Sequence, residues 1–221
     1  MLYALGDPVS FVLLLASTLV ALTLHGWLTS LIAARSGDRT LARSGRLRPD
    51  PRHQLNAYGV LGALVGGVGW STPVARPTHR RKGALTALAL TGGLVLVGLG
   101  MALLLTLHLT PQYSAPGTPV TGLLRAGTVG GSLGQRALLV SGVVFLSSGV
   151  LSLLPLPPLA GSRLLFGLAP RTRGWQQAED QLEERNFGVL ALLVLSLLAA
   201  GLLYAILNAF VSPLARLATG G

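Results

Sequence analysis

Four long apolar runs constrain this chain more than any other feature of its sequence. They cover about residues 9–34, 84–109, 136–154 and 187–211, and each holds at most one Lys, Arg, Asp or Glu. A helix of about 20 residues crosses the hydrocarbon core of a bilayer. Lipid offers the backbone no hydrogen-bond partner, so a membrane-crossing run folds as a helix. The sequence therefore predicts an all-α polytopic membrane protein with four transmembrane helices.

The composition fits one integral membrane domain over residues 1–221. Apolar residues make up 51% of the chain and charged residues 11%, which is typical of polytopic membrane proteins. The net charge of +10 comes almost entirely from arginines in the loops, with few aromatic residues among them. This pattern indicates anchoring at a lipid bilayer and argues against a nucleic-acid partner. The chain has no cysteine, which excludes a disulfide framework and a thiolate metal site.

The arginine distribution predicts the orientation in the cell (cytoplasmic) membrane. The loop 35–52 carries six Arg against two Asp, the loop 76–82 carries three Arg and one Lys with no acidic residue, and the loop 163–185 carries four Arg with four acidic residues. By the positive-inside rule these three loops lie on the cytoplasmic side, with both termini on the outer side. No basic region precedes the first apolar run, so we expect that run to be retained and not cleaved as a signal peptide.

A glycine-rich apolar run over residues 57–74 lies between two of these basic loops. A single crossing would place the two loops on opposite sides of the membrane. We therefore expect a re-entrant segment that enters and returns, covered by other parts of the protein. An ordinary helix with packing glycines is the alternative.

An imidazole, His25, lies two-thirds of the way along the first apolar run, where burial of a polar group is costly. Taken alone, it could simply be a polar residue that bonds a neighbouring helix. The motifs after it resemble those of the site-2 protease family of intramembrane zinc metalloproteases, in its compact bacterial form. They appear in the family's order over roughly residues 22–165: Gly37-Asp38-Arg39-Thr40, Gly45-Arg46-Leu47, Asp50-Pro51, Gly69-Trp70-Ser71-Thr72-Pro73-Val74 and Leu153-Leu154-Pro155-Leu156-Pro157-Pro158-Leu159-Ala160-Gly161.

The departures from the family pattern fall where the chemistry would be. The resemblance implies two His one helical turn apart as zinc ligands, a Glu between them as general base, and a late Asp as third ligand. His25 keeps the first ligand position, but the base position is Gly26, the second ligand position is Thr29 and the late Asp is Ala160. Gly and Ala have no side chain that binds metal or moves protons, and Thr is a poor zinc ligand. We therefore predict no bound zinc and no other cofactor.

These substitutions leave a scaffold without its catalytic residues. The leading interpretation is a catalytically inactive protein that acts as a binding, scaffold or regulatory subunit of a complex with other transmembrane proteins. The alternative is an active zinc metalloprotease in which His25 is joined by substitute ligands from the loops. A transporter or channel is disfavoured because the spans lack charge. The candidate substitute ligands are Asp38, Asp50, His53 and His79.

The former catalytic positions are also expected to pack tightly. Gly26, Thr29 and Ala160 are smaller than the residues they replace. The proline-rich segment 155–161 cannot continue the third helix, so we expect it to pack directly over Gly26 and Thr29 and close the cavity. The Thr29 hydroxyl would then bond the carbonyl one turn back. Small residues in the second span should let a neighbouring helix approach closely: Gly92, Gly93, Gly98 and Gly100.

Overall fold

The computed structural model describes residues 7–38, 40–66, 69–74, 82–110, 132–157, 159–168, 172–179, 181–182, 187–198 and 200–219. This part of the chain is helical, and its β-type pairing is limited to one isolated antiparallel bridge between Leu55 and Ser71. The prediction of an all-α membrane protein is confirmed at this level. The α-helices are α1 (Pro8–Arg35), α2 (Thr40–Arg43), α3 (Pro51–Gln54), α4 (Ala57–Gly66), α5 (Lys82–His108), α7 (Leu133–Leu153), α8 (Ser162–Leu168), α9 (Arg173–Glu179), α10 (Phe187–Leu198) and α11 (Ala200–Thr219).

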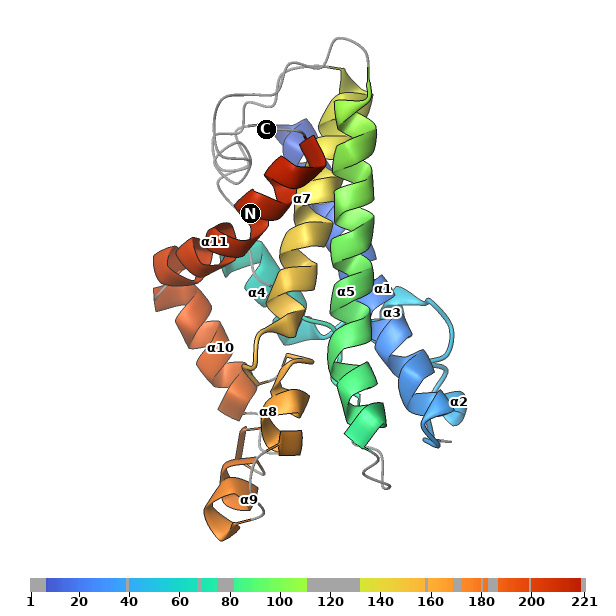
Figure 1. The fold of residues 1–221 in the computed structure, drawn as a ribbon, viewed down its shortest axis with the longest axis vertical. Helices are drawn as coiled ribbons and strands as arrows, with labels where there is room; N and C mark the ends of the chain where they lie inside the picture. Colours follow the sequence, from blue (N-terminus) through green and yellow to red (C-terminus); the bar gives the residue numbers. More distant parts are fainter. Residues whose placement is uncertain are drawn as a thin grey trace.

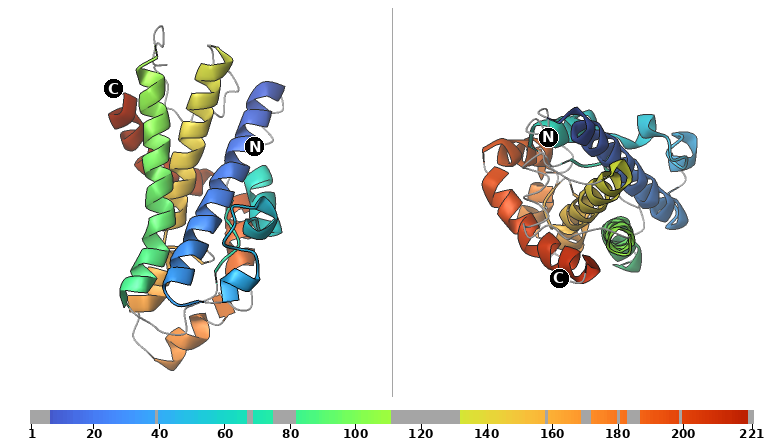
Figure 2. Two further views of the ribbon diagram at one scale, coloured as in Figure 1. Left: turned by 90° about the vertical axis from the view of Figure 1, so that its right-hand side faces the viewer. Right: turned by 90° about the horizontal axis from the view of Figure 1, so that it is seen from above.

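Three helices, α1, α5 and α7, are long and apolar enough to cross a bilayer, judged over the described residues. They match the predicted spans 9–34, 84–109 and 136–154. Figure 2 shows the three side by side, and Figure 1 shows α8 and α9 at one end of this group. α1 begins and α11 ends toward the other end (Figure 1).

Local signals explain where these helices begin and end. The Asp7 carboxylate accepts hydrogen bonds from two backbone N–H groups at the start of α1, and Pro8 takes the first helical position. Ser132 and Gln135 form a capping box that starts α7. α7 ends at Leu153, before Pro155, where a proline and the restriction on its predecessor prevent continuation of the helix.

The last apolar run differs from the prediction of one continuous span over 187–211. α10 ends at Leu198, α11 begins at Ala200 and continues to Thr219, and the two helices meet at an angle (Figure 1). Neither is among the membrane-length helices of the described chain. The two helices follow different neighbours, since α10 packs on α4 while α11 packs on α5 and α7.

The glycine-rich run turns back on itself. After α4, residues 69–74 run in an extended conformation, Ser71 pairs with Leu55, and the Thr72 N–H donates to the Gln54 carbonyl at 2.8 Å. Gly59 permits this return, because a Cβ there would overlap the Trp70 carbonyl. Residues 54–55 and 71–72 thus lie side by side, with α4 between them in the chain.

Glycines set the close packing of α5 against α7. A Cβ on Gly100 would lie 2.6 Å from the Leu146 backbone nitrogen, and one on Gly149 would lie 2.7 Å from the Gly93 carbonyl. Such contacts between backbones are typical of small residues at helix interfaces in lipid. The expectation for Gly93 and Gly100 is confirmed. Gly98 differs, because the space beside its Cα is open.

An ion pair joins α1 to α7 at the end opposite α8. Arg136 of α7 donates from Nη2 to the Asp7 carboxylate and, at 2.9 Å, to the Ser10 hydroxyl. The Ser10 hydroxyl donates to Asp7 at 2.7 Å. This bond from Ser10, together with the charge of Arg136, lowers the pKa of Asp7.

Candidate functional site

The positions that the family pattern assigns to the first ligand, the base and the second ligand lie on one buried stretch of α1. His25, Gly26, Thr29 and Ser30 are all buried. The Thr29 hydroxyl donates to the His25 carbonyl at 3.0 Å and the Gly26 carbonyl at 2.9 Å, while Ser30 donates to the Gly26 carbonyl at 2.8 Å. The expected self-satisfaction of Thr29 is confirmed. Its hydroxyl proton is used within the helix, which leaves the oxygen only as an acceptor.

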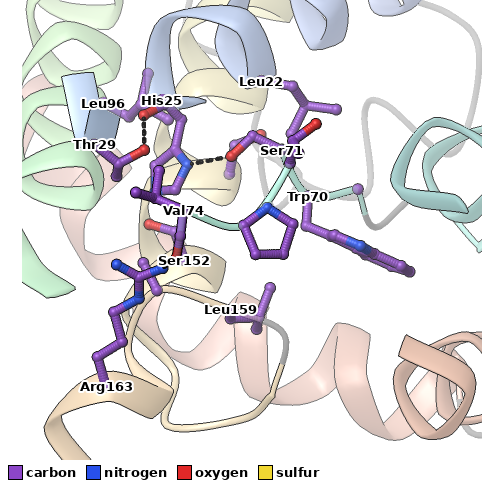
Figure 3. Close-up of a pocket in the computed structure, with 15 residues that line it drawn as sticks. Leu22, His25, Thr29, Trp70, Ser71, Val74, Leu96, Ser152, Leu159 and Arg163 are labelled. Carbon is purple, nitrogen blue, oxygen red and sulfur yellow. Dashed lines mark hydrogen bonds between the residues drawn. The ribbon is translucent and has the colours of Figure 1, made fainter. Parts of the chain in front are cut away.

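His25 is held between α5 and the returning segment. Its Nδ1 forms a 2.8 Å hydrogen bond with the Ser71 hydroxyl, drawn as a dashed line in Figure 3. On the other side the ring packs on Gly92, where a Cβ would lie 2.8 Å from the His25 Cδ2. The buried Nε2 has no hydrogen-bond partner among the described residues. The imidazole is therefore fixed by packing and by one hydrogen bond.

A cavity of about 30 Å³ opens beside His25, room for roughly one or two water molecules. Among the described residues that line it, Arg163 of α8 is the one Lys, Arg, Asp or Glu. Its side chain donates a hydrogen bond to the Val74 carbonyl, and Figure 3 shows both residues at the cavity. The part of the lining that the structure describes thus carries a positive charge and no carboxylate. Its lining is Leu22, His25, Thr29, Gly69, Trp70, Ser71, Thr72, Pro73, Val74, Leu96, Ser148, Ser152, Leu159, Ala160 and Arg163.

The expected packing of the proline-rich segment over Gly26 is wrong. The atoms nearest to a Cβ on Gly26 belong to Gln54, at 2.8 Å from Oε1, and to Ser71, at 3.1 Å from Cβ. α3 and the returning segment cover this face of α1. Leu159 and Ala160 line the cavity together with Thr29 instead. The former base position is closed from a different side than the sequence suggested.

The residues around His25 do not fit a zinc ion. Catalytic zinc needs three protein ligands with an open fourth position. His25 supplies one nitrogen, the Thr29 hydroxyl is bonded to its own helix, and Ala160 supplies none. Arg163 would add a positive charge beside the metal. Over the ranges that the structure describes, no three His, Cys, Asp or Glu side chains gather within reach of one metal ion.

The candidate substitute ligands that the structure describes, Asp38, Asp50 and His53, do not line the cavity beside His25. Asp50 caps α3 by accepting from the Arg52 N–H at 2.9 Å, and Asp38 follows the end of α1. The exposed His53 ring rests on Gly45, 3.2 Å from the place of a Cβ there. His79 lies outside the described residues. The described part of the chain therefore gives no support to a ligand set around His25.

The first retained motifs form a clamp on the returning segment. Arg46 donates from Nη2 to the Thr72 carbonyl at 2.7 Å and from Nη1 to the Pro73 carbonyl at 3.0 Å. Partial burial of the guanidinium lowers its pKa. Gly45 has a φ of 73°, which favours glycine. Gly37, with a φ of 105°, gives the turn after α1, and Thr40 begins α2.

The later motifs are also structural. Trp70 is buried in an apolar cluster with Leu159 and residues of α7 and α10. Gly161 packs against the Leu153 and Leu154 carbonyls, where a Cβ would overlap them, and its N–H donates to the Ser152 carbonyl at 2.9 Å. Among the remaining retained positions, Gly69 packs on Ala63, Pro73 and Pro155 are exposed, Pro157 is half-buried, and Pro158 lies outside the described residues.

Sequence reasoning missed the parts that Gln54 and Arg163 play. Gln54 stands in a basic loop with no periodic pattern to predict burial, yet its side chain is fully buried. Arg163 looked like one more loop cation, but it lines the cavity. The proximity of Arg163 to the late proline block was the one signal that could have placed it there.

Most of the chain is similar to a curated bacterial protein. It is 30% identical over 211 residues to a protein of Bacillus subtilis (strain 168) named "Putative zinc metalloprotease YwhC", and the alignment covers 91% of this chain and 89% of that protein. No protein-family model matches the chain. No solved structure is similar enough to match.

Proposed function

The chain belongs to the site-2 protease family of membrane zinc metalloproteases, and from this premise we propose that it is a catalytically inactive member that acts by binding. One observation carries the proposal. At the former catalytic site the single metal-binding type of side chain is His25, and it faces a cavity whose ionised lining residue is a cation. A metal-activated water would also need a base, and Gly26 has no side chain to act as one.

The contacts of the retained motifs support a scaffold role. Arg46 still holds the returning segment, Gly161 still allows close backbone packing, and Trp70 still fills the core. A fold kept for its shape needs these contacts but does not need ligands. The protein would therefore serve as a scaffold or regulatory subunit that holds other transmembrane proteins without cutting them.

The proposal includes a place in the membrane. α1, α5 and α7 cross the cell membrane, α10 and α11 together complete a fourth passage, and α4 with residues 69–74 forms a re-entrant element. Both termini lie outside. Single cysteines at Ser44 and Ser114, introduced into this cysteine-free chain, should label from opposite sides of the membrane. Labelling from the same side would overturn this topology.

Zinc content tests the loss of catalysis directly. Protein purified without a histidine tag should carry well below one zinc per chain by elemental analysis, because one imidazole supplies too few ligands. A His25→Ala variant should give the same value. Near-stoichiometric zinc that disappears in His25→Ala would instead support the alternative, an active metalloprotease with substitute ligands.

A further inference from the structure

Gln54 has a fully buried polar side chain that lies against Gly26. It lies at the end of α3. Its amide nitrogen donates to the Arg46 carbonyl at 2.7 Å and to the Arg48 carbonyl at 3.1 Å. Its backbone carbonyl accepts from the Thr72 N–H at 2.8 Å. The residue thus joins the loop after α2 to the returning segment.

These bonds fix which end of the amide faces α1. Both amide protons are used by loop carbonyls, so Oε1 must point the other way. There it lies 2.8 Å from the place of a Cβ on Gly26 and has no hydrogen-bond partner among the described residues. Flipping the amide would set Oε1 against two carbonyl oxygens. The orientation is therefore determined by the loop and not by contacts with α1.

A side chain at residue 26 would force the Gln54 carboxamide to shift. A Cβ contact of 2.8 Å to the Gln54 oxygen is shorter than real Cβ atoms tolerate, and the Gln54 Cβ and the Ser71 Cβ follow at 3.2 and 3.1 Å. Moving Oε1 away also moves the amide nitrogen, which strains its hydrogen bonds to the two loop carbonyls. The lack of a side chain at residue 26 and the position of the Gln54 amide therefore depend on each other.

We propose that Gln54 is a plug of the former catalytic site, whose carboxamide occupies the space that a base at residue 26 would need. This inference rests on the proposed function and deepens it. Two residues on different elements, Gly26 and Gln54, together keep the site inactive. Reintroducing a base at residue 26 must fail unless the side chain at residue 54 is also shortened.

A double-mutant cycle tests this coupling in the full-length protein. We compare Gly26→Ala, Gln54→Ala and the double variant by unfolding in mild detergent. With Gln54 present, Gly26→Ala should lower the folded-to-unfolded ratio at least tenfold. In the Gln54→Ala background the same change should have a several-fold smaller effect, because the 2.8 Å contact with Oε1 is gone while the contacts with the Cβ atoms of residue 54 and Ser71 remain. Should Gln54→Ala not fold, Gln54→Asn withdraws the amide by one methylene and replaces it in the cycle.

Gly92→Ala is the matched control. This glycine of α5 packs as tightly, but against His25 instead of Gln54, so its effect should be equal with and without Gln54. If Gln54 contributed only to general stability, each glycine substitution would cost the same with and without the Gln54 side chain. Equal effects of Gly26→Ala in the two backgrounds would overturn the plug and leave the proposed function standing. Zinc-dependent proteolysis by the wild-type protein would overturn the proposed function and leave the cycle unchanged.

Discussion

Replacing Arg46 with methionine tests whether the retained Gly45-Arg46 motif now serves structure. The guanidinium bonds the Thr72 and Pro73 carbonyls at 2.7 and 3.0 Å. A hydrogen bond to a charged group contributes about 1.5–3 kcal/mol. The bond to Pro73 is exposed and should count for less, so the substitution should weaken closure of the returning segment by about 2–3 kcal/mol. Methionine keeps much of the apolar stem, which isolates the loss of the two bonds.

Thiol labelling measures this closure, because the chain has no cysteine of its own. Val74 is 4% exposed, so a Val74→Cys probe reacts when the segment opens. Each 1.4 kcal/mol is about tenfold in an equilibrium, so Arg46→Met should raise the labelling rate roughly 30- to 150-fold. Arg48→Met is the control, since Arg48 is exposed and the backbone carbonyl that it offers to Gln54 survives the change. Less than a threefold rise for Arg46→Met would refute the clamp.

Three further predictions concern the fold and the former site. The pKa of Asp7 is lowered in the folded protein, so the ionised carboxylate stabilises the fold above the ordinary pKa of 3.8, and this effect is lost as pH falls through the folded pKa. Asp7→Asn should therefore make the melting temperature depend less on pH over that acidic range. An unchanged dependence of melting temperature on pH would contradict this. Gly100→Ala should cost about 1–3 kcal/mol of unfolding free energy by crowding α7. Gly98→Ala, which faces open space, should not destabilise the fold. Equal costs for the two substitutions would count against the close α5–α7 contact. The triple variant Gly26→Glu, Thr29→His and Ala160→Asp should melt lower than wild type without regaining proteolysis, because residue 26 lies in packed space and a charge buried there is costly. Zinc-dependent cleavage at unchanged stability would show that the site is open.

The long helices could be predicted from the sequence because lipid leaves an apolar run little other choice of structure. α1, α5 and α7 each follow an uninterrupted run, and caps or prolines mark several of their ends. The bend between α10 and α11 could not be predicted, since the run is apolar on both sides of it. The bend depends on packing against α4 on one side and against α5 and α7 on the other. Such tertiary contacts are not visible in the pattern of apolar residues along the run.

The candidate site, too, could be predicted from the sequence only in part. The motif positions predicted that His25 and Ala160 would meet at one place, and both line the cavity. The residue that closes Gly26 was not predictable, because Gln54 is 28 positions away in the chain and its burial depends on loop carbonyls. The proline-rich segment was the expected cover from its motif alone. The structure places α3 and the returning segment over Gly26 instead, through hydrogen bonds that no sequence pattern predicts.

The most direct test of the central claim is cleavage of a reporter transmembrane substrate by the purified wild-type protein in liposomes with zinc supplied. The account predicts no cleavage product above the level of a His25→Ala variant, because the site lacks a base and a ligand set. Cleavage that needs zinc, stops with a chelator and disappears in His25→Ala would contradict it and would make the protein a working protease.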